Sequence, residues 1–171
     1  KNGLFSDAAV NPVKILVLFL SMTFISVFLD ELGFFEYLAE KAIGSGGKTQ
    51  RGLFIKLYAL VSVLTVFTSN DIIVLTFTPF ICCFAKNAKI NPVPYLFAEF
   101  IAANTWSMCL MIGNPTNIYL ATAANIDFWK YFAVMLLPTV FAGITSFLLL
   151  LLIFKRPLSE PLCGEKSEEK K

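Results

Sequence analysis

The sequence contains no histidine and only four cysteines among its 171 residues. Histidine is the commonest metal ligand and general base, so its absence argues against zinc hydrolases, haem proteins and Ser-His-Asp catalysis. The cysteines form no CxxC spacing, and Cys82, Cys83 and Cys109 lie inside apolar runs, which indicates reduced core residues. We therefore expect no enzyme, no catalytic or metal site and no resident cofactor.

Charge is also scarce, because charged residues make up 15% of the chain and hydrophobic residues 57%, with a mean hydropathy of +0.71. A soluble domain of this length is rarely so apolar, so the composition predicts a membrane protein with the lipid bilayer as its partner. The net charge of +2 is small and the basic residues are scattered, which argues against a nucleic-acid partner.

Five apolar stretches follow one another along the chain, and two of them are long enough to be spanning helices. A shorter segment alternates apolar and charged residues at helical spacing, as a helix on the membrane surface does. The predicted all-α membrane protein comprises a lead-in (1–12), a transport repeat (13–154) with spanning helices (13–29 and 131–154) and a surface helix (33–44), and a polar cytoplasmic linker or tail (155–171).

The stretch TSNDIIVLTFTP, Thr68 to Pro79, places polar residues between two apolar arms, 53–67 and 72–85. Arms of about 14 or 15 residues reach roughly 21–23 Å, which is short of a ~30 Å hydrocarbon core. Residues of capping type separate the arms, and either Asn70 or Asp71 is suited to begin the second one. The pattern predicts a re-entrant helical hairpin over 53–85 with its polar tip at membrane depth.

The run from Tyr95 to Asn125 is interrupted by GNPTN, Gly113 to Asn117. Gly113 suits the end of a helix, Asn114 suits an N-cap, and Pro115 suits the first position of the next helix. These residues predict a broken helix over 95–125 with its gap near the middle of the bilayer. Irregular backbone is tolerated at that depth only where protein or a water-filled cavity covers it.

The distribution of lysine and arginine favours the hairpin, because these residues prefer the cytoplasmic side. If 53–85 crossed the membrane once, the basic residues would divide almost evenly between the two sides. With a hairpin that enters from the cytoplasm, three lie outside (Lys1, Lys14 and Lys130) and eight lie inside: Lys41, Lys48, Arg51, Lys56, Lys86, Lys89, Lys155 and Arg156. We therefore expect a multi-pass protein of the cell membrane with a cytoplasmic tail.

The segment FTSNDIIVLTFTPF, followed about forty residues later by IGNPTNIYLA, resembles the first repeat of the ion transporter superfamily. The resemblance is to the branch of arsenite-efflux permeases, sodium/proton antiporters and anion permeases with citrate-transporter-like domains, and it runs from about Lys14 to Phe154. It implies one of two inverted repeats, whose hairpins and broken helices together surround the substrate. Because each motif occurs once, we expect the amino-terminal half of a carrier that is a homodimer when complete, with the second repeat as a missing partner.

Carriers of this kind bind anions at half-helix N-termini and cations at half-helix C-termini. The predicted substrate or ion site therefore combines the hairpin tip with the helix break: Thr68, Ser69, Asn70, Asp71, Gly113, Asn114, Pro115, Thr116 and Asn117. Asn104 and Thr105 are further candidates, although polar side chains in membranes more often bond to neighbouring helices. Glu99 lies near a helix end, so we expect its carboxylate to reach the membrane interface rather than to take part in transport.

These features predict a secondary active transporter for arsenite or a small inorganic or organic anion, coupled to H⁺ or Na⁺. A carboxylate at the tip repels multiply charged anions, which favours neutral arsenous acid, and Asp71 also offers a reversible charge for coupling. The other interpretation of Asp71 is an ordinary helix cap. Two alternative functions remain, a sodium/proton antiporter and a membrane assembly subunit that transports nothing, whereas no motif supports an enzyme.

The charge distribution generates a topology prediction. Single cysteines placed at Lys48, Lys89 and Glu165 should all react with a membrane-impermeant thiol reagent from the cytoplasmic side only. Labelling of position 89 from outside would show instead that the hairpin crosses the membrane.

Overall fold

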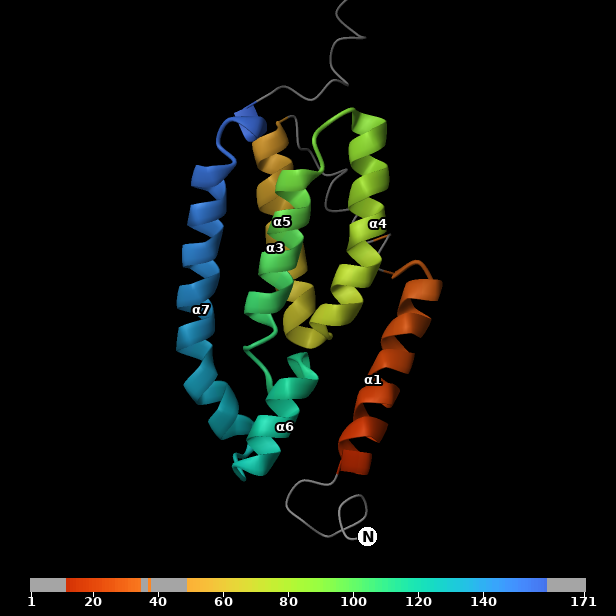
Figure 1. The fold of residues 1–171 in the computed structure, drawn as a ribbon, viewed down its shortest axis with the longest axis vertical. Coiled ribbons are helices and arrows are strands. Elements are labelled where there is room, and N and C mark those ends of the chain that lie inside the picture. The colour runs from red at the N-terminus through yellow and green to blue at the C-terminus, as the bar shows by residue number, and fades with distance from the viewer. Residues whose placement is uncertain (1–11, 35–36, 38–48, 160–171) are drawn as a thin grey trace, which may run out of the picture.

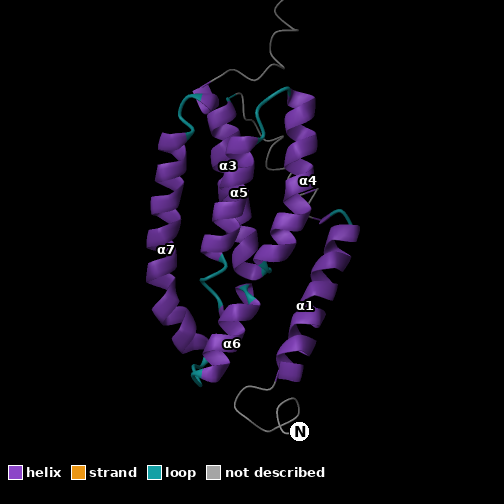
Figure 2. Ribbon diagram, in the orientation of Figure 1, coloured by secondary structure: helices purple, strands orange, loops and turns teal. Residues whose placement is uncertain are grey.

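The computed structural model of the chain describes residues 12–34, 37 and 49–159. This part of the chain is an all-α membrane protein without a strand (Figure 2), as the sequence predicts. The predicted surface helix over 33–44 lies almost entirely outside the described residues. In chain order, the elements are α1 (Pro12–Glu31), α3 (Gln50–Phe67), α4 (Asn70–Ala88), α5 (Val93–Trp106), η1 (Met111–Gly113), α6 (Pro115–Ala123), α7 (Phe128–Ile153) and η2 (Pro157–Ser159).

α3 and α4 form a helical hairpin that turns at Thr68 and Ser69. Figure 1 shows α3 running from one end of the molecule to about half its height, and α4 returning to the same end. α1, α6 and α7 all extend past the turn, so the tip of the hairpin lies inside the molecule rather than at its far end. The chain therefore reverses direction inside the molecule, as the predicted hairpin does.

The two arms contain 18 and 19 residues, so the predicted arms of 14 or 15 residues were too short. Both helices continue through polar residues at their outer ends, such as Gln50 and Arg51 in α3 and Lys86 and Asn87 in α4. An apolar run therefore underestimates the length of a helix that extends into the interface. α3, α4 and α7 are each long and apolar enough to cross a membrane, so arm length alone does not argue for re-entry.

α5 occupies the centre of the bundle and packs against α3, α4 and α7. Its inward face carries small residues, and Ala98, Ala102 and Ala103 are all completely buried. Small residues let helices approach closely, which is the main source of packing energy where lipid is as apolar as the side chains. Phe54 of α3 and Phe77 of α4 fill the remaining space around α5 and are also buried.

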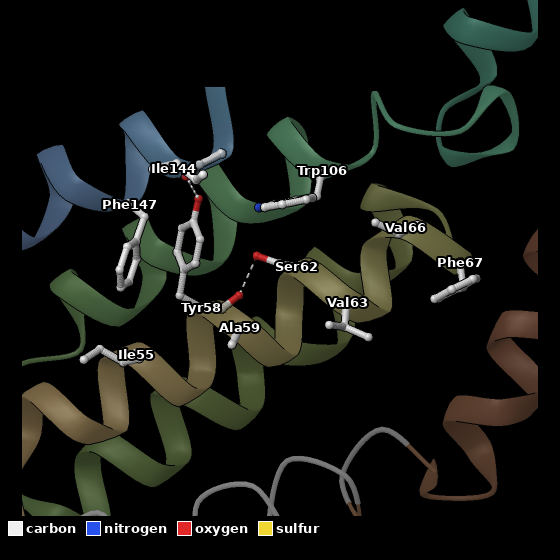
Figure 3. Close-up of a pocket in the computed structure, with 11 residues that line it drawn as sticks. Ile55, Tyr58, Ala59, Ser62, Val63, Val66, Phe67, Trp106, Ile144 and Phe147 are labelled. Atoms are coloured by element: carbon white, nitrogen blue, oxygen red, sulfur yellow. Dashed lines mark hydrogen bonds between the residues drawn. The ribbon is translucent and has the colours of Figure 1, made fainter. Parts of the chain in front are cut away.

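A polar contact joins α3 to α7, where the Tyr58 hydroxyl donates to the Gly143 carbonyl at 2.8 Å. The same hydroxyl lies 3.0 Å from Ser146 Oγ, and the Phe147 ring packs on Tyr58 with centroids 4.9 Å apart. Gly143 also lets α5 approach, since an added Cβ would lie 2.7 Å from the indole of Trp106. Figure 3 shows Tyr58, Trp106 and Phe147 along an apolar groove of about 490 Å³ between α3 and α7.

The last spanning helix and the start of the tail also differ from the prediction. α7 has 26 residues rather than 24, because the Asp127 side chain caps it and accepts from the Trp129 amide at 3.3 Å. Beyond α7, residues 157–159 form η2, which packs against α3 and buries Leu158. The first residues of the predicted polar tail (155–171) are therefore part of the bundle, because Leu158 anchors them to it.

The contact between α3 and α7 generates a stability prediction. Tyr58→Phe removes one buried hydrogen bond, while Gly143 O still accepts from Ser146 Oγ at 3.1 Å. We expect a loss of about 1 kcal/mol in the free energy of unfolding, measured by titration with a denaturing detergent. The matched control is Tyr119→Phe on α6, where the ring is exposed, and an equal loss in both variants would contradict the role of the hydrogen bond.

Candidate functional site

The turn of the hairpin places the predicted tip residues in distinct positions. Thr68 is the C-cap of α3, and its hydroxyl donates to the Leu64 carbonyl at 2.8 Å. Ser69 is the N-cap residue of α4, and Asn70 and Asp71 are the first two residues of that helix. The prediction that Asn70 or Asp71 caps α4 was therefore wrong. Serine, asparagine and aspartate cap helices about equally well, so residue type could not choose between them.

The tip holds polar oxygens that are buried and lack partners. Ser69 Oγ makes no capping bond to α4, and neither it nor Asn70 Oδ1 has a hydrogen-bond partner among the described residues. The hydroxyl of Thr65, in the last turn of α3, is also buried and has no hydrogen-bond partner among the described residues. An unpaired buried polar group costs about 1–3 kcal/mol. Three unpaired atoms within six consecutive residues favour a binding partner from outside this segment, which would complete their hydrogen bonds.

The side chain of Asn70 joins the hairpin to the broken helix. Its Nδ2 donates to Asn104 Oδ1 on α5 at 3.1 Å, and the Asn104 amide in turn donates to the Phe100 carbonyl at 2.8 Å. The second bond orients the Asn104 oxygen toward the tip. Thr105, next to Asn104, is half-buried. Among the described residues, its side chain makes no hydrogen bond to the hairpin.

The helix break is wider than predicted, because α5 ends at Trp106 and not at Gly113. Residues 107–114 connect α5 to α6 and contain the short helix η1. Asn114 caps α6, as expected, by accepting from the Thr116 amide at 2.9 Å, and Pro115 is the first residue of that helix. The Thr116 side chain is exposed.

Asn117 closes the break from the side of α6. Its Nδ2 donates to the Ser107 carbonyl at 3.0 Å and to the Leu110 carbonyl at 3.4 Å. Gly113 allows the same fold-back, since an added Cβ would collide with the backbone of Ser107. The end of α5 and the start of α6 are thus tied together across the interrupted segment.

The hairpin tip and the helix break lie beside each other, with η1 packed against α3 (Figure 1). Four helix termini therefore lie at a similar height of the molecule: the C-termini of α3 and α5 and the N-termini of α4 and α6. C-terminal carbonyls attract cations and N-terminal amides attract anions. Asp71 is exposed at this junction and adds a negative charge to it.

Glu99 departs furthest from the sequence prediction, because its side chain is only 1% exposed and does not reach the interface. Both carboxylate oxygens accept from the Thr78 hydroxyl of α4, at 3.2 and 3.3 Å. A signal for this burial exists in the sequence. Glu99 shares one helical face with Tyr95, Ala98, Ala102 and Ala103, all of which are buried, and a stripe of small residues marks the packed side of a membrane helix.

Other sequence candidates do not form a site. Within residues 12–34, 37 and 49–159, no three side chains of the metal-binding types come together. Cys109 is buried as expected, but Cys82 and Cys83 are exposed on α4, because an apolar run in a membrane helix has a face toward lipid as well as one toward protein. The apolar groove of Figure 3 contains none of the predicted site residues.

Comparison with known proteins places this architecture in a family, because the sequence model of that family, described as citrate transporter, matches residues 5–165. The chain belongs to the citrate transporter family. The matched range includes both the hairpin and the helix break, so the two interruptions are parts of a transporter domain. No solved structure matches the chain.

Two of the three relatives described next are named as membrane proteins. The chain is 28% identical to an arsenical pump membrane protein of Escherichia coli, over 82% of this chain and 33% of that protein. It is 31% identical to the P protein of Mus musculus over 81% and 17%, and 28% identical to a 46 kDa membrane protein of Mycobacterium leprae over 74% and 29%. The chain thus spans between about a sixth and a third of the length of these relatives.

The close packing of the break generates a prediction for this family member. Gly113→Ala should lower the free energy of unfolding by about 1–3 kcal/mol, because the new methyl group meets the rigid backbone of Ser107. Gly52→Ala in the first turn of α3 is the control, since its added Cβ meets only the Thr49 hydroxyl, at 3.3 Å. Detergent unfolding of both variants measures the difference, and an unchanged Gly113→Ala would show that the break is loosely packed.

Proposed function

We propose that this chain is one repeat of a secondary active transporter that moves arsenite or a small anion in exchange for protons or cations. The observation that carries the proposal is the junction of the hairpin tip with the helix break, where the side chains of Asn70 and Asn104 meet at 3.1 Å. Two interruptions that meet within a membrane domain build a polar site that neither could form alone. The substrate binds there.

The charge at the junction favours one class of substrate. The family description names citrate, and one relative is named as an arsenical pump protein. Citrate carries several negative charges, and the exposed carboxylate of Asp71 at the tip opposes their approach. Arsenous acid is neutral and can donate and accept hydrogen bonds, which suits the unpaired oxygens of Ser69 and Asn70. We therefore rank arsenite above citrate as the substrate.

The remaining parts of the proposal concern the assembly. A second repeat, related to this one by inversion, supplies the other hairpin and broken helix, and the complete carrier forms a homodimer in the cell membrane. The start of α3, the end of α4 and the end of α7 lie together at one end of the molecule, which we assign to the cytoplasm (Figure 1). This assignment agrees with Arg51, Lys86 and Lys155 at those helix ends.

A sodium/proton antiporter is the second candidate, because the unpaired oxygens at the end of α3 are ligand types that Na⁺ accepts. A membrane assembly subunit without transport is the third. Flux measurements separate these candidates from one another.

The proposal is tested with the carrier that contains this chain, reconstituted in liposomes and supplied in parallel with arsenite, citrate or sodium. We expect arsenite flux to exceed citrate flux, and Asn70→Ala to weaken arsenite binding by about 1–3 kcal/mol, because it removes the buried Asn70 oxygen that the proposed site offers to the substrate. Asn87→Ala, at an exposed asparagine near the end of α4, is the matched control. Sodium-driven proton movement without arsenite or citrate flux would identify an antiporter, and absence of all three fluxes would contradict transport.

A further inference from the structure

The contact between α4 and α5 holds a carboxyl group that the substrate site does not use. Glu99 of α5 is only 1% exposed, and its side-chain hydrogen bonds are to the hydroxyl of Thr78 on α4. An ionised carboxylate has about four positions that accept hydrogen bonds. Here a single O–H group is shared by both oxygens, at distances longer than those typical of bonds to an ionised group. The surroundings therefore fit the neutral acid better than the anion.

No positive charge compensates Glu99 in the part of the chain that the structure describes. The tyrosine hydroxyls on the helices around it are engaged elsewhere: Tyr58 with Gly143, Tyr95 with Gln50 and Tyr131 with Met108. The other ionisable groups on α3, α4 and α7 are Arg51, Lys56, Asp71, Cys82, Cys83, Lys86 and Lys130. Lys56 is half-buried and the rest are exposed. None of them bonds to Glu99.

The position of Glu99 connects it to the proposed substrate site. Among the described residues, side-chain hydrogen bonds join α4 to α5 at two places, Asn70 to Asn104 at the tip and Thr78 to Glu99 farther along. Pro79 follows Thr78 directly and removes a backbone donor from the middle of α4, which is the usual cause of a bend in a helix. A change at Glu99 therefore acts on the hairpin arm whose other end contacts the substrate site.

We propose that Glu99 binds the proton that the carrier exchanges for its substrate, an inference that rests on the proposed function. The carboxylate takes a proton from water and becomes a neutral acid, which packs against Thr78 with α4 closed on α5. When the acid returns its proton to water, the anion has too few donors in the closed contact. Ionisation therefore favours separation of α4 from α5 and entry of water. The proton thereby controls the arm that carries Asn70.

The test uses the same reconstituted carrier, with a pH-sensitive dye inside the liposomes and arsenite as the probe. Glu99→Gln should reduce arsenite-driven proton movement by about tenfold or more, because the amide cannot exchange a proton. Arsenite exchange at equal concentrations on both sides, which needs no net proton movement, should persist. Glu31→Gln, at an exposed carboxylate at the end of α1, is the matched control and should change neither reading.

Two further variants keep the test decisive if Glu99→Gln does not fold. Glu99→Asp should keep proton movement with a displaced pH dependence, and Thr78→Val should displace that dependence toward higher pH, since it removes the donor to the anion, whereas Thr78→Ser should not. A pH dependence unchanged in Glu99→Asp and Thr78→Val would overturn the assignment.

The remaining outcomes separate this inference from the proposed function. Full proton movement in Glu99→Gln would exclude Glu99 while leaving transport intact, and its loss in Asp71→Asn alone would assign the proton to the tip. A wild-type carrier that moves neither arsenite nor citrate would overturn the proposed function and this inference with it.

Discussion

A helix that ends inside a bundle of membrane helices leaves carbonyl and amide groups that apolar surroundings cannot satisfy, and the structure contains two such interruptions, at the hairpin tip and at the break between α5 and α6. At the break between α5 and α6, the chain satisfies them itself. Asn117 donates to the carbonyls of Ser107 and Leu110, and Asn114 accepts from the first turn of α6. Together with the close approach of Gly113 to Ser107, these bonds make the break a fixed structure.

The hairpin tip follows the opposite pattern. Ser69 occupies the cap position but makes no side-chain cap, and the oxygens of Thr65, Ser69 and Asn70 stay unpaired within the described residues. Each unpaired group is unfavourable by an amount comparable to a lost hydrogen bond, so a segment that keeps three of them gains more than other segments from a bound ion, a substrate or a facing repeat. This contrast is the reason we propose a binding role for the tip and a supporting role for the break.

The sequence predicted those parts of the fold that local chemistry determines. Capping residues and Pro115 locate the interruptions, and the apolar runs locate the helices. Arm lengths were underestimated because helices continue into polar residues, and nothing local marks the end of α5 at Trp106. The prediction that Glu99 reaches the interface was wrong because it used the distance of Glu99 from the helix end and not the face of α5 on which it lies. Only the face it shares with Ala98 and Ala102 indicates that it points into the bundle.

The two carboxyl groups, of Asp71 and Glu99, show that burial depends more on the helical face that carries a residue than on its distance from the helix end. Asp71 begins α4 and is exposed, whereas Glu99 faces the centre of the bundle from α5. Between the two polar contacts of α4, Ile73 and Phe77 are 0% and 1% exposed, so an apolar layer separates Asn70 from Thr78. Such a layer holds no chain of polar groups along which a proton could pass. Any influence of Glu99 on the tip must therefore travel through the position of α4 as a whole, and Pro79 lies where that helix can bend.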